Sequence, residues 1–111
     1  MKIFDTHAHY DDEAFDGDRD ELLKKLLSDD IDMIVNVGAS LSGCKASVAL
    51  AKKYDNIYAS VGVHPDDYEK LNEEFLDWIK STCLSDPKVV AVGEIGLDYH
   101  YPEPSRDVQL K

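Results

Sequence analysis

Four short apolar runs, which begin about 24 to 32 residues apart, constrain the fold more than any other feature of the chain. They span Lys2–Asp5, Asp32–Val37, Ile57–Val63 and Val89–Gly93. The second and fourth runs are continuously apolar at their centres, which is typical of parallel strands that are covered on both faces. Each run is therefore predicted to be a strand that forms one βα unit with the segment after it.

The segments between the runs carry apolar residues at helical spacing. These residues are Leu22, Leu23, Leu26 and Leu27, then Cys44, Val48 and Ala51, then Phe75, Leu76, Ile79 and Cys83. Ser40 or Ser42 is predicted to cap the second helix and Asn72 the third. Residues 101–111 form a predicted loop that enters a fourth helix, where the chain ends inside an element as a truncated product would. We expect one α/β domain over residues 1–111, with about four βα units.

Acidic residues outnumber basic residues by 23 to 12, which gives a formal net charge of −11. This balance argues against a protein that binds nucleic acid along a broad basic surface. A polyanionic substrate would need bound divalent cations to reverse the local field.

The start of the sequence lacks the pattern of a secretory signal, and no apolar run approaches the roughly 20 residues that span a membrane. We therefore expect a cytoplasmic chain without membrane contact, in which Cys44 and Cys83 are free thiols.

His7 and His9 lie two residues apart at the end of the first run. Alternate residues of a strand point the same way, so the two imidazoles, about 7 Å apart along the strand, can converge on one cation. Asp5 lies one step deeper on that face, where its carboxylate could orient a ligand imidazole. Two surface histidines in a loop are the alternative.

Glu94 follows the fourth run, where an otherwise apolar parallel strand ends. Catalytic groups gather at the carboxyl ends of strands in α/β folds, so a metal shared by Glu94 and the two histidines explains both positions. His64 follows the third run in the same way, next to a glycine that permits close backbone approach. We predict that His64 contacts a substrate phosphate; a loop histidine with ordinary hydrogen bonds is the alternative. Asp98 and Tyr99 belong to the loop after the fourth run, as candidate substrate contacts or packing residues.

Three motifs, Phe4–His9, Gly62–Pro65 and Gly93–Tyr99, resemble the N-terminal signatures of the TatD family of metal-dependent deoxyribonucleases. The resemblance covers the whole chain and implies the N-terminal half of a TIM-type (β/α)8 barrel, since a complete barrel has about 250 residues. It implies an enzyme that cleaves phosphodiester bonds at DNA or RNA ends with two divalent metals, Mg, Mn or Zn. It also implies that His7 and His9 bind one metal and that Glu94, a catalytic residue, bridges to the second.

The further ligands that the resemblance implies, two histidines and an aspartate on later strands, have no counterpart in these 111 residues, so we expect the isolated chain to be weak or inactive. A related barrel hydrolase that cleaves C–N or C–O bonds is one alternative. A half-barrel that only binds metal or oligomerises is another. Because its sheet edges would be open, we expect self-association or pairing with a complementary C-terminal half.

Overall fold

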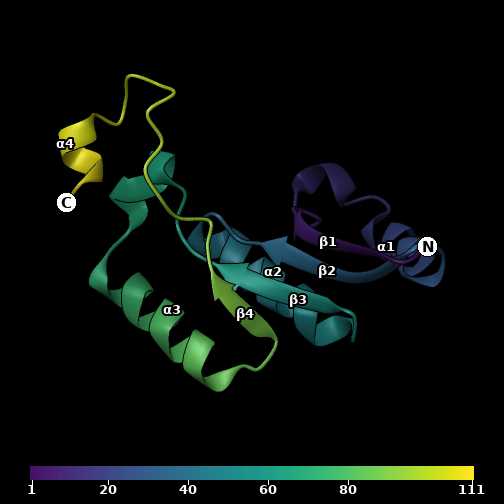
Figure 1. The fold of residues 1–111 in the computed structure, drawn as a ribbon. Helices are drawn as coiled ribbons and strands as arrows, with labels where there is room; N and C mark the ends of the chain where they lie inside the picture. The colour runs from purple at the N-terminus through teal and green to yellow at the C-terminus, as the bar shows by residue number, and fades with distance from the viewer.

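The computed structural model describes residues 1–111 and shows four parallel strands alternating with helices (Figure 1). The sheet has the order β1-β2-β3-β4, with parallel pairing throughout. The elements are β1 (Ile3–Ala8), η1 (Glu13–Phe15), α1 (Arg19–Ser28), β2 (Ile31–Val37), α2 (Leu41–Lys53), β3 (Ile57–Val61), η2 (Pro65–Lys70), α3 (Glu73–Ser85), β4 (Val89–Val92) and α4 (Arg106–Gln109). The predicted α/β half-barrel is confirmed, including the short fourth helix.

Three helices pack on one face of the sheet, because right-handed crossovers between sequential neighbouring strands all pass on the same side. One core cluster joins α2 and α3 to β3 and β4, and a second joins α1 and α2 to β1, β2 and β3. Ser40 and Asn72 cap α2 and α3 by accepting the Gly43 and Phe75 N–H groups, at 3.2 and 2.8 Å. Both caps are among those the sequence predicts.

The opposite face of the sheet is uncovered. Val89 belongs to the helix-side core, so strand alternation turns Val90 and Val92 to the other face, where they are 52% and 55% exposed. Ile3 and Met33 are also large apolar residues with substantial exposure, at 44% and 37%. Parallel sheets are normally buried on both faces, so this apolar surface has the character of a barrel interior.

Two strands, β1 and β3, end at other residues than predicted, and both differences fall at the carboxyl ends, next to the candidate site residues. β1 continues to Ala8, three residues past its predicted end, because it pairs with β2 as far as Ala8 and Asn36. β3 ends at Val61, before its predicted end at Val63, because its pairing with β4 ends at Val61 and Val92. The two 3-10 helices were not predicted. No helix has both the length and the apolar character that crossing a bilayer requires.

Candidate metal centre

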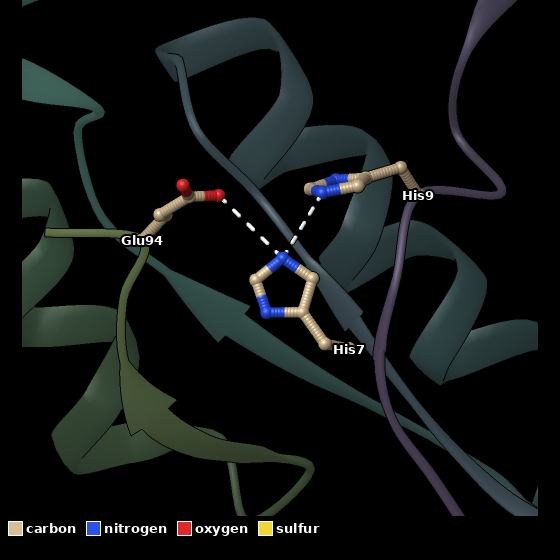
Figure 2. Close-up of side chains that lie close together, drawn as sticks. All are labelled: His7, His9 and Glu94. Atoms are coloured by element: carbon tan, nitrogen blue, oxygen red, sulfur yellow. Dashed lines mark hydrogen bonds and ion pairs between the residues drawn. The ribbon is translucent and has the colours of Figure 1, made fainter. Parts of the chain in front are cut away.

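Two histidines and a glutamate meet at the carboxyl ends of β1 and β4 (Figure 2). The Nε2 atoms of His7 and His9 lie 3.1 Å apart, and Nε2 of His7 lies 3.6 Å from Oε2 of Glu94. All three candidate ligand atoms lie within 4.8 Å of one another. Tetrahedral donors at about 2.0–2.2 Å from a Zn²⁺ ion are separated by about 3.4 Å. The His7–His9 and His7–Glu94 separations are therefore close to those expected for donors that share one cation.

The ring of His9 is held with a nitrogen free for a metal. Its Nδ1 atom lies 2.9 Å from the carbonyl oxygen of Val37, at the end of β2. A carbonyl oxygen can only accept, so Nδ1 carries the proton and Nε2 keeps a lone pair that faces His7. A metal-binding imidazole commonly has its second nitrogen fixed in this way by a carbonyl or carboxylate.

That Asp5 orients an imidazole stays a prediction, because in this structure its carboxylate is hydrogen-bonded to the main chain of His7. Its Oδ1 atom accepts the main-chain N–H of His7 at 3.2 Å, and it hydrogen-bonds to neither ring. The carbonyl of Val37 performs that task for His9. No residue-type signal could have identified it, because every residue carries a carbonyl and only the register of the strands decides which one lies nearby.

Main-chain packing brings Glu94 to the histidines. The Glu94 N–H donates to the carbonyl of Gly38 at 3.1 Å. A Cβ atom on Gly62 would lie 2.6 Å from the Glu94 carbonyl oxygen, and one on Gly38 would lie 2.5 Å from Cα of Cys44. The close backbone approach predicted for Gly62 is therefore confirmed: Gly62 lets the segment after β4 approach the end of β3, whereas Gly38 lets helix α2 approach the end of β2.

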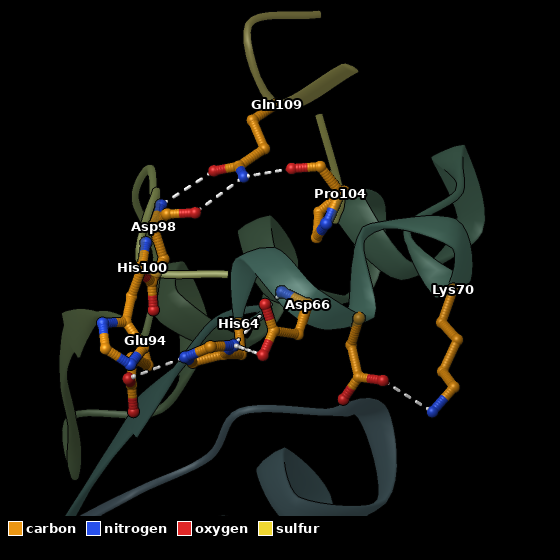
Figure 3. A network of polar contacts seen from close by, with 9 residues as sticks. His64, Asp66, Lys70, Glu94, Asp98, His100, Pro104 and Gln109 are labelled. Atoms are coloured by element: carbon orange, nitrogen blue, oxygen red, sulfur yellow. Dashed lines mark hydrogen bonds and ion pairs between the residues drawn. The ribbon is translucent and has the colours of Figure 1, made fainter. Parts of the chain in front are cut away.

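His64 is brought to the other side of Glu94, with its Nε2 atom 3.4 Å from Oε1 (Figure 3). Its Nδ1 atom accepts the main-chain N–H of Asp66 at 3.1 Å, so the neutral ring carries its proton on Nε2. The carboxylate of Asp66 is 3.7 Å from Nδ1, beyond hydrogen-bonding distance. His64 therefore presents a donor to the site, whereas His9 presents an acceptor.

Asp98 and Tyr99 do not join this cluster. Gln109 holds the main chain of Asp98 through two hydrogen bonds of 2.7 Å, and Oδ1 of Asp98 accepts the N–H of His100 at 2.9 Å (Figure 3). The ring of Tyr99 lies 4.5 Å from the guanidinium carbon of Arg106. Neither residue makes a hydrogen bond or ion pair with His7, His9 or Glu94.

A parallel βα sheet with two imidazoles and a carboxylate at the carboxyl ends of its strands defines the class: the N-terminal half of a (β/α) barrel with a candidate metal centre. The chain belongs to the TatD-related DNase family, whose model matches residues 4–111.

Known relatives agree with this placement. The chain is 39% identical over 107 residues to the uncharacterized metal-dependent hydrolase YabD of Bacillus subtilis, covering 96% of this chain and 42% of YabD. It is 33% identical over 98 residues to the 3'-5' ssDNA/RNA exonuclease TatD of Cronobacter turicensis, covering 88% of this chain and 37% of that protein. The crystal structure of YjjV, a TatD homologue from Escherichia coli, matches 97% of this chain and 42% of its own, with a TM-score of 0.84 and 32% identity. The chain thus spans about two fifths of the length of these relatives.

Proposed function

We propose that this chain is the metal-binding half of a phosphodiesterase that cleaves the ends of DNA or RNA, with His7, His9 and Glu94 holding a divalent cation. The convergence of their three ligand atoms within 4.8 Å carries the proposal. The name of the Cronobacter relative, a 3'-5' ssDNA/RNA exonuclease, supports the choice of substrate.

When bound, divalent cations polarise a phosphoryl group and favour the ionisation of water. The contribution of this chain is to hold them. Glu94 turns one carboxylate oxygen toward His7 and the other toward His64, so it could share a cation with the histidines and still have an oxygen to offer to a second cation. We assign Glu94 this bridging role, with Mg, Mn or Zn as the metal.

His64 has the chemistry of a phosphate contact. Its Nε2–H lies beside Glu94, and the side chain of His64 is 28% exposed, so a ligand can reach it. An N–H donor at this position suits a non-bridging phosphate oxygen. Tyr99 is 43% exposed and lies against Arg106, so this pair is our candidate for contact with a base or sugar beyond the phosphate. Asp98 would support this contact by holding the loop that carries Tyr99.

The three donors define a single cation, and a second one needs ligands from elsewhere. We therefore expect the chain alone to bind one metal and to cleave DNA weakly or not at all.

Zinc titration by calorimetry tests the metal centre. The wild-type chain is expected to bind one Zn²⁺, and His7→Ala and Glu94→Gln are each expected to weaken binding at least tenfold. His100→Ala is the matched control, because His100 packs edge-on against Tyr101 at 4.6 Å and lies outside the cluster. Equal affinity in wild type and both cluster variants would exclude the assignment.

The uncovered face suggests how a complete site forms. We propose that the exposed face around Val90 and Val92 is covered by polypeptide that supplies the remaining βα units and metal ligands. Supporting this, YjjV matches nearly all of this chain but is more than twice as long.

The part of YjjV that this chain does not match can serve as the probe. We expect it to bind the chain and to yield manganese-dependent cleavage of a labelled single-stranded oligonucleotide. Val92→Lys should abolish binding, whereas Leu84→Lys, at a position 80% exposed in α3, should not. Sedimentation of the chain alone as a dimer that Val92→Lys dissociates would instead favour self-association.

A further inference from the structure

A polar residue, Asn36, is fully buried near the end of β2, one residue before the carbonyl that holds His9. The centre of the same strand is apolar, with Ile34 also fully buried on the same face. Burying an amide is unfavourable unless its hydrogen-bonding groups find partners. The contacts of Asn36 therefore indicate what the residue does.

Every polar group of the Asn36 amide has a partner. Oδ1 accepts the main-chain N–H of Tyr10 at 2.6 Å. Nδ2 donates to Oδ1 of Asp11 and to Oγ of Ser47, both at 2.8 Å. The amide thus links the loop after β1 to helix α2, since Ser47 belongs to α2.

This link begins where the strand pairing ends. Ala8 and Asn36 form the last pair of the β1–β2 ladder, and the chain leaves β1 at His9. From there, Asn36 takes the N–H of Tyr10 and Val37 takes the ring of His9. Two adjacent residues of β2 therefore hold two adjacent residues of the loop.

Arg19 holds the same loop from the other side. Its Nε atom donates to the carbonyl of Tyr10 at 2.6 Å, and Nη2 donates to the carbonyl of Asp12 at 2.8 Å. Arg19 thus holds the carbonyl of Tyr10, and the side-chain amide of Asn36 joins the N–H of Tyr10 to β2.

We propose that Asn36 is a positioning residue for the metal centre. It fixes the main chain at Tyr10 so that His9 keeps its Nδ1 proton on the Val37 carbonyl and offers Nε2 to the cation. This inference rests on the proposed metal site. Replacing an ordinary buried core residue would change stability alone. The test must therefore measure zinc affinity and the protonation of the His9 ring as well as stability.

The test compares Asn36→Leu, which is similar in size and lacks all three hydrogen bonds, with two controls. Ser47→Ala removes the partner on the far side from His9, and Ile34→Val perturbs the core of the same strand. Zinc affinity is measured by calorimetry on folded protein, and the ¹⁵N shifts of the His9 ring are measured without metal.

We expect Asn36→Leu to bind Zn²⁺ about 10- to 100-fold more weakly, the range found when partners of metal ligands are removed. Its His9 ring should mix two tautomers, whereas both controls should keep wild-type affinity and an Nδ1 proton. Asn36→Asp combined with Asp11→Asn retains the acceptor for Tyr10, avoids two facing carboxylates and should recover the single tautomer.

Wild-type affinity in a folded Asn36→Leu variant would overturn the proposal. So would a wild-type chain whose His9 carries its proton on Nε2, a result that needs no variant to fold. A wild-type chain that binds no zinc but shows the Asn36-dependent tautomer would refute the metal site and leave the positioning of the ring intact.

Discussion

Replacing Gly62 by alanine tests whether backbone contact between β3 and the segment after β4 sets the position of Glu94. The new Cβ atom would lie 2.6 Å from the Glu94 carbonyl oxygen and 2.6 Å from the Gly93 carbonyl carbon. Ordinary contact begins near 3.4 Å, so one side must move by about 0.8 Å.

The displacement should fall on Glu94. Gly62 is held from the helix side by Cys44, whose Sγ atom donates to the Gly62 carbonyl at 3.2 Å and accepts its N–H at 3.3 Å. Metal sites tolerate errors of about 0.2 Å in ligand distance. A shift several times larger should lower zinc affinity about 10- to 100-fold. Overpacking of this kind should also destabilise the fold by about 1–3 kcal/mol.

Calorimetric zinc titration and urea unfolding measure the two effects on the same sample. Gly17→Ala is the control, because no atom lies within 4 Å of a Cβ atom at that position. A Gly62→Ala variant with the zinc affinity and unfolding midpoint of wild type would refute the reasoning, since the contact would then be too soft to position the carboxylate.

Three further predictions concern residues outside the site. Hydrogen bonds from Lys53 and Tyr54 lower the pKa of Asp20 below its ordinary value, so its stabilising effect is present above that ordinary value and is lost as the pH falls through the lower pKa of the folded state. Asp20→Asn should therefore flatten the acid side of a plot of melting temperature against pH. Burial raises the pKa of the Cys44 thiol, so a thiol reagent should label it only after unfolding, as mass spectrometry of labelled peptides can check. Asn72→Ala removes the cap of α3 and should cost about 1 kcal/mol in urea unfolding, whereas Asn72→Ser should cost less.

The arrangement of the elements was predictable because it depends on residue type and period. The continuous apolar run from Val89 to Val92 indicates a parallel strand, and the regular spacing of such runs indicates βα units. Parallel strands end at one edge of a sheet, so polar residues after separate strands are expected to meet there. His7, His9 and Glu94 do meet, although 85 positions separate the last two in the sequence.

The hydrogen bonds that hold the site were not predictable, because they depend on register. Ala8 pairs with Asn36 only after an irregularity between Asp5 and Ala8, which no periodicity reveals. The apolar pattern of β2 gave no reason to choose Asn36 as a partner of the loop. A polar residue directly after the apolar run Met33–Val35 was the available signal, and its partners became evident only in three dimensions.

The position of the ring proton distinguishes two histidines that occupy similar positions in the sequence, each shortly after a predicted strand. His9 and His64 both follow parallel strands and both lie near Glu94, yet His9 donates through Nδ1 to a carbonyl while His64 accepts an N–H at the same atom. The free lone pair of His9 therefore faces the site at Nε2, where His64 presents a proton. A cation is attracted to the first arrangement and repelled by the second, whereas a phosphate oxygen has the opposite preference. Under the proposed function, the histidine-bound metal would therefore lie on the β1 side of Glu94, and His64 would donate its Nε2 proton to a phosphate oxygen.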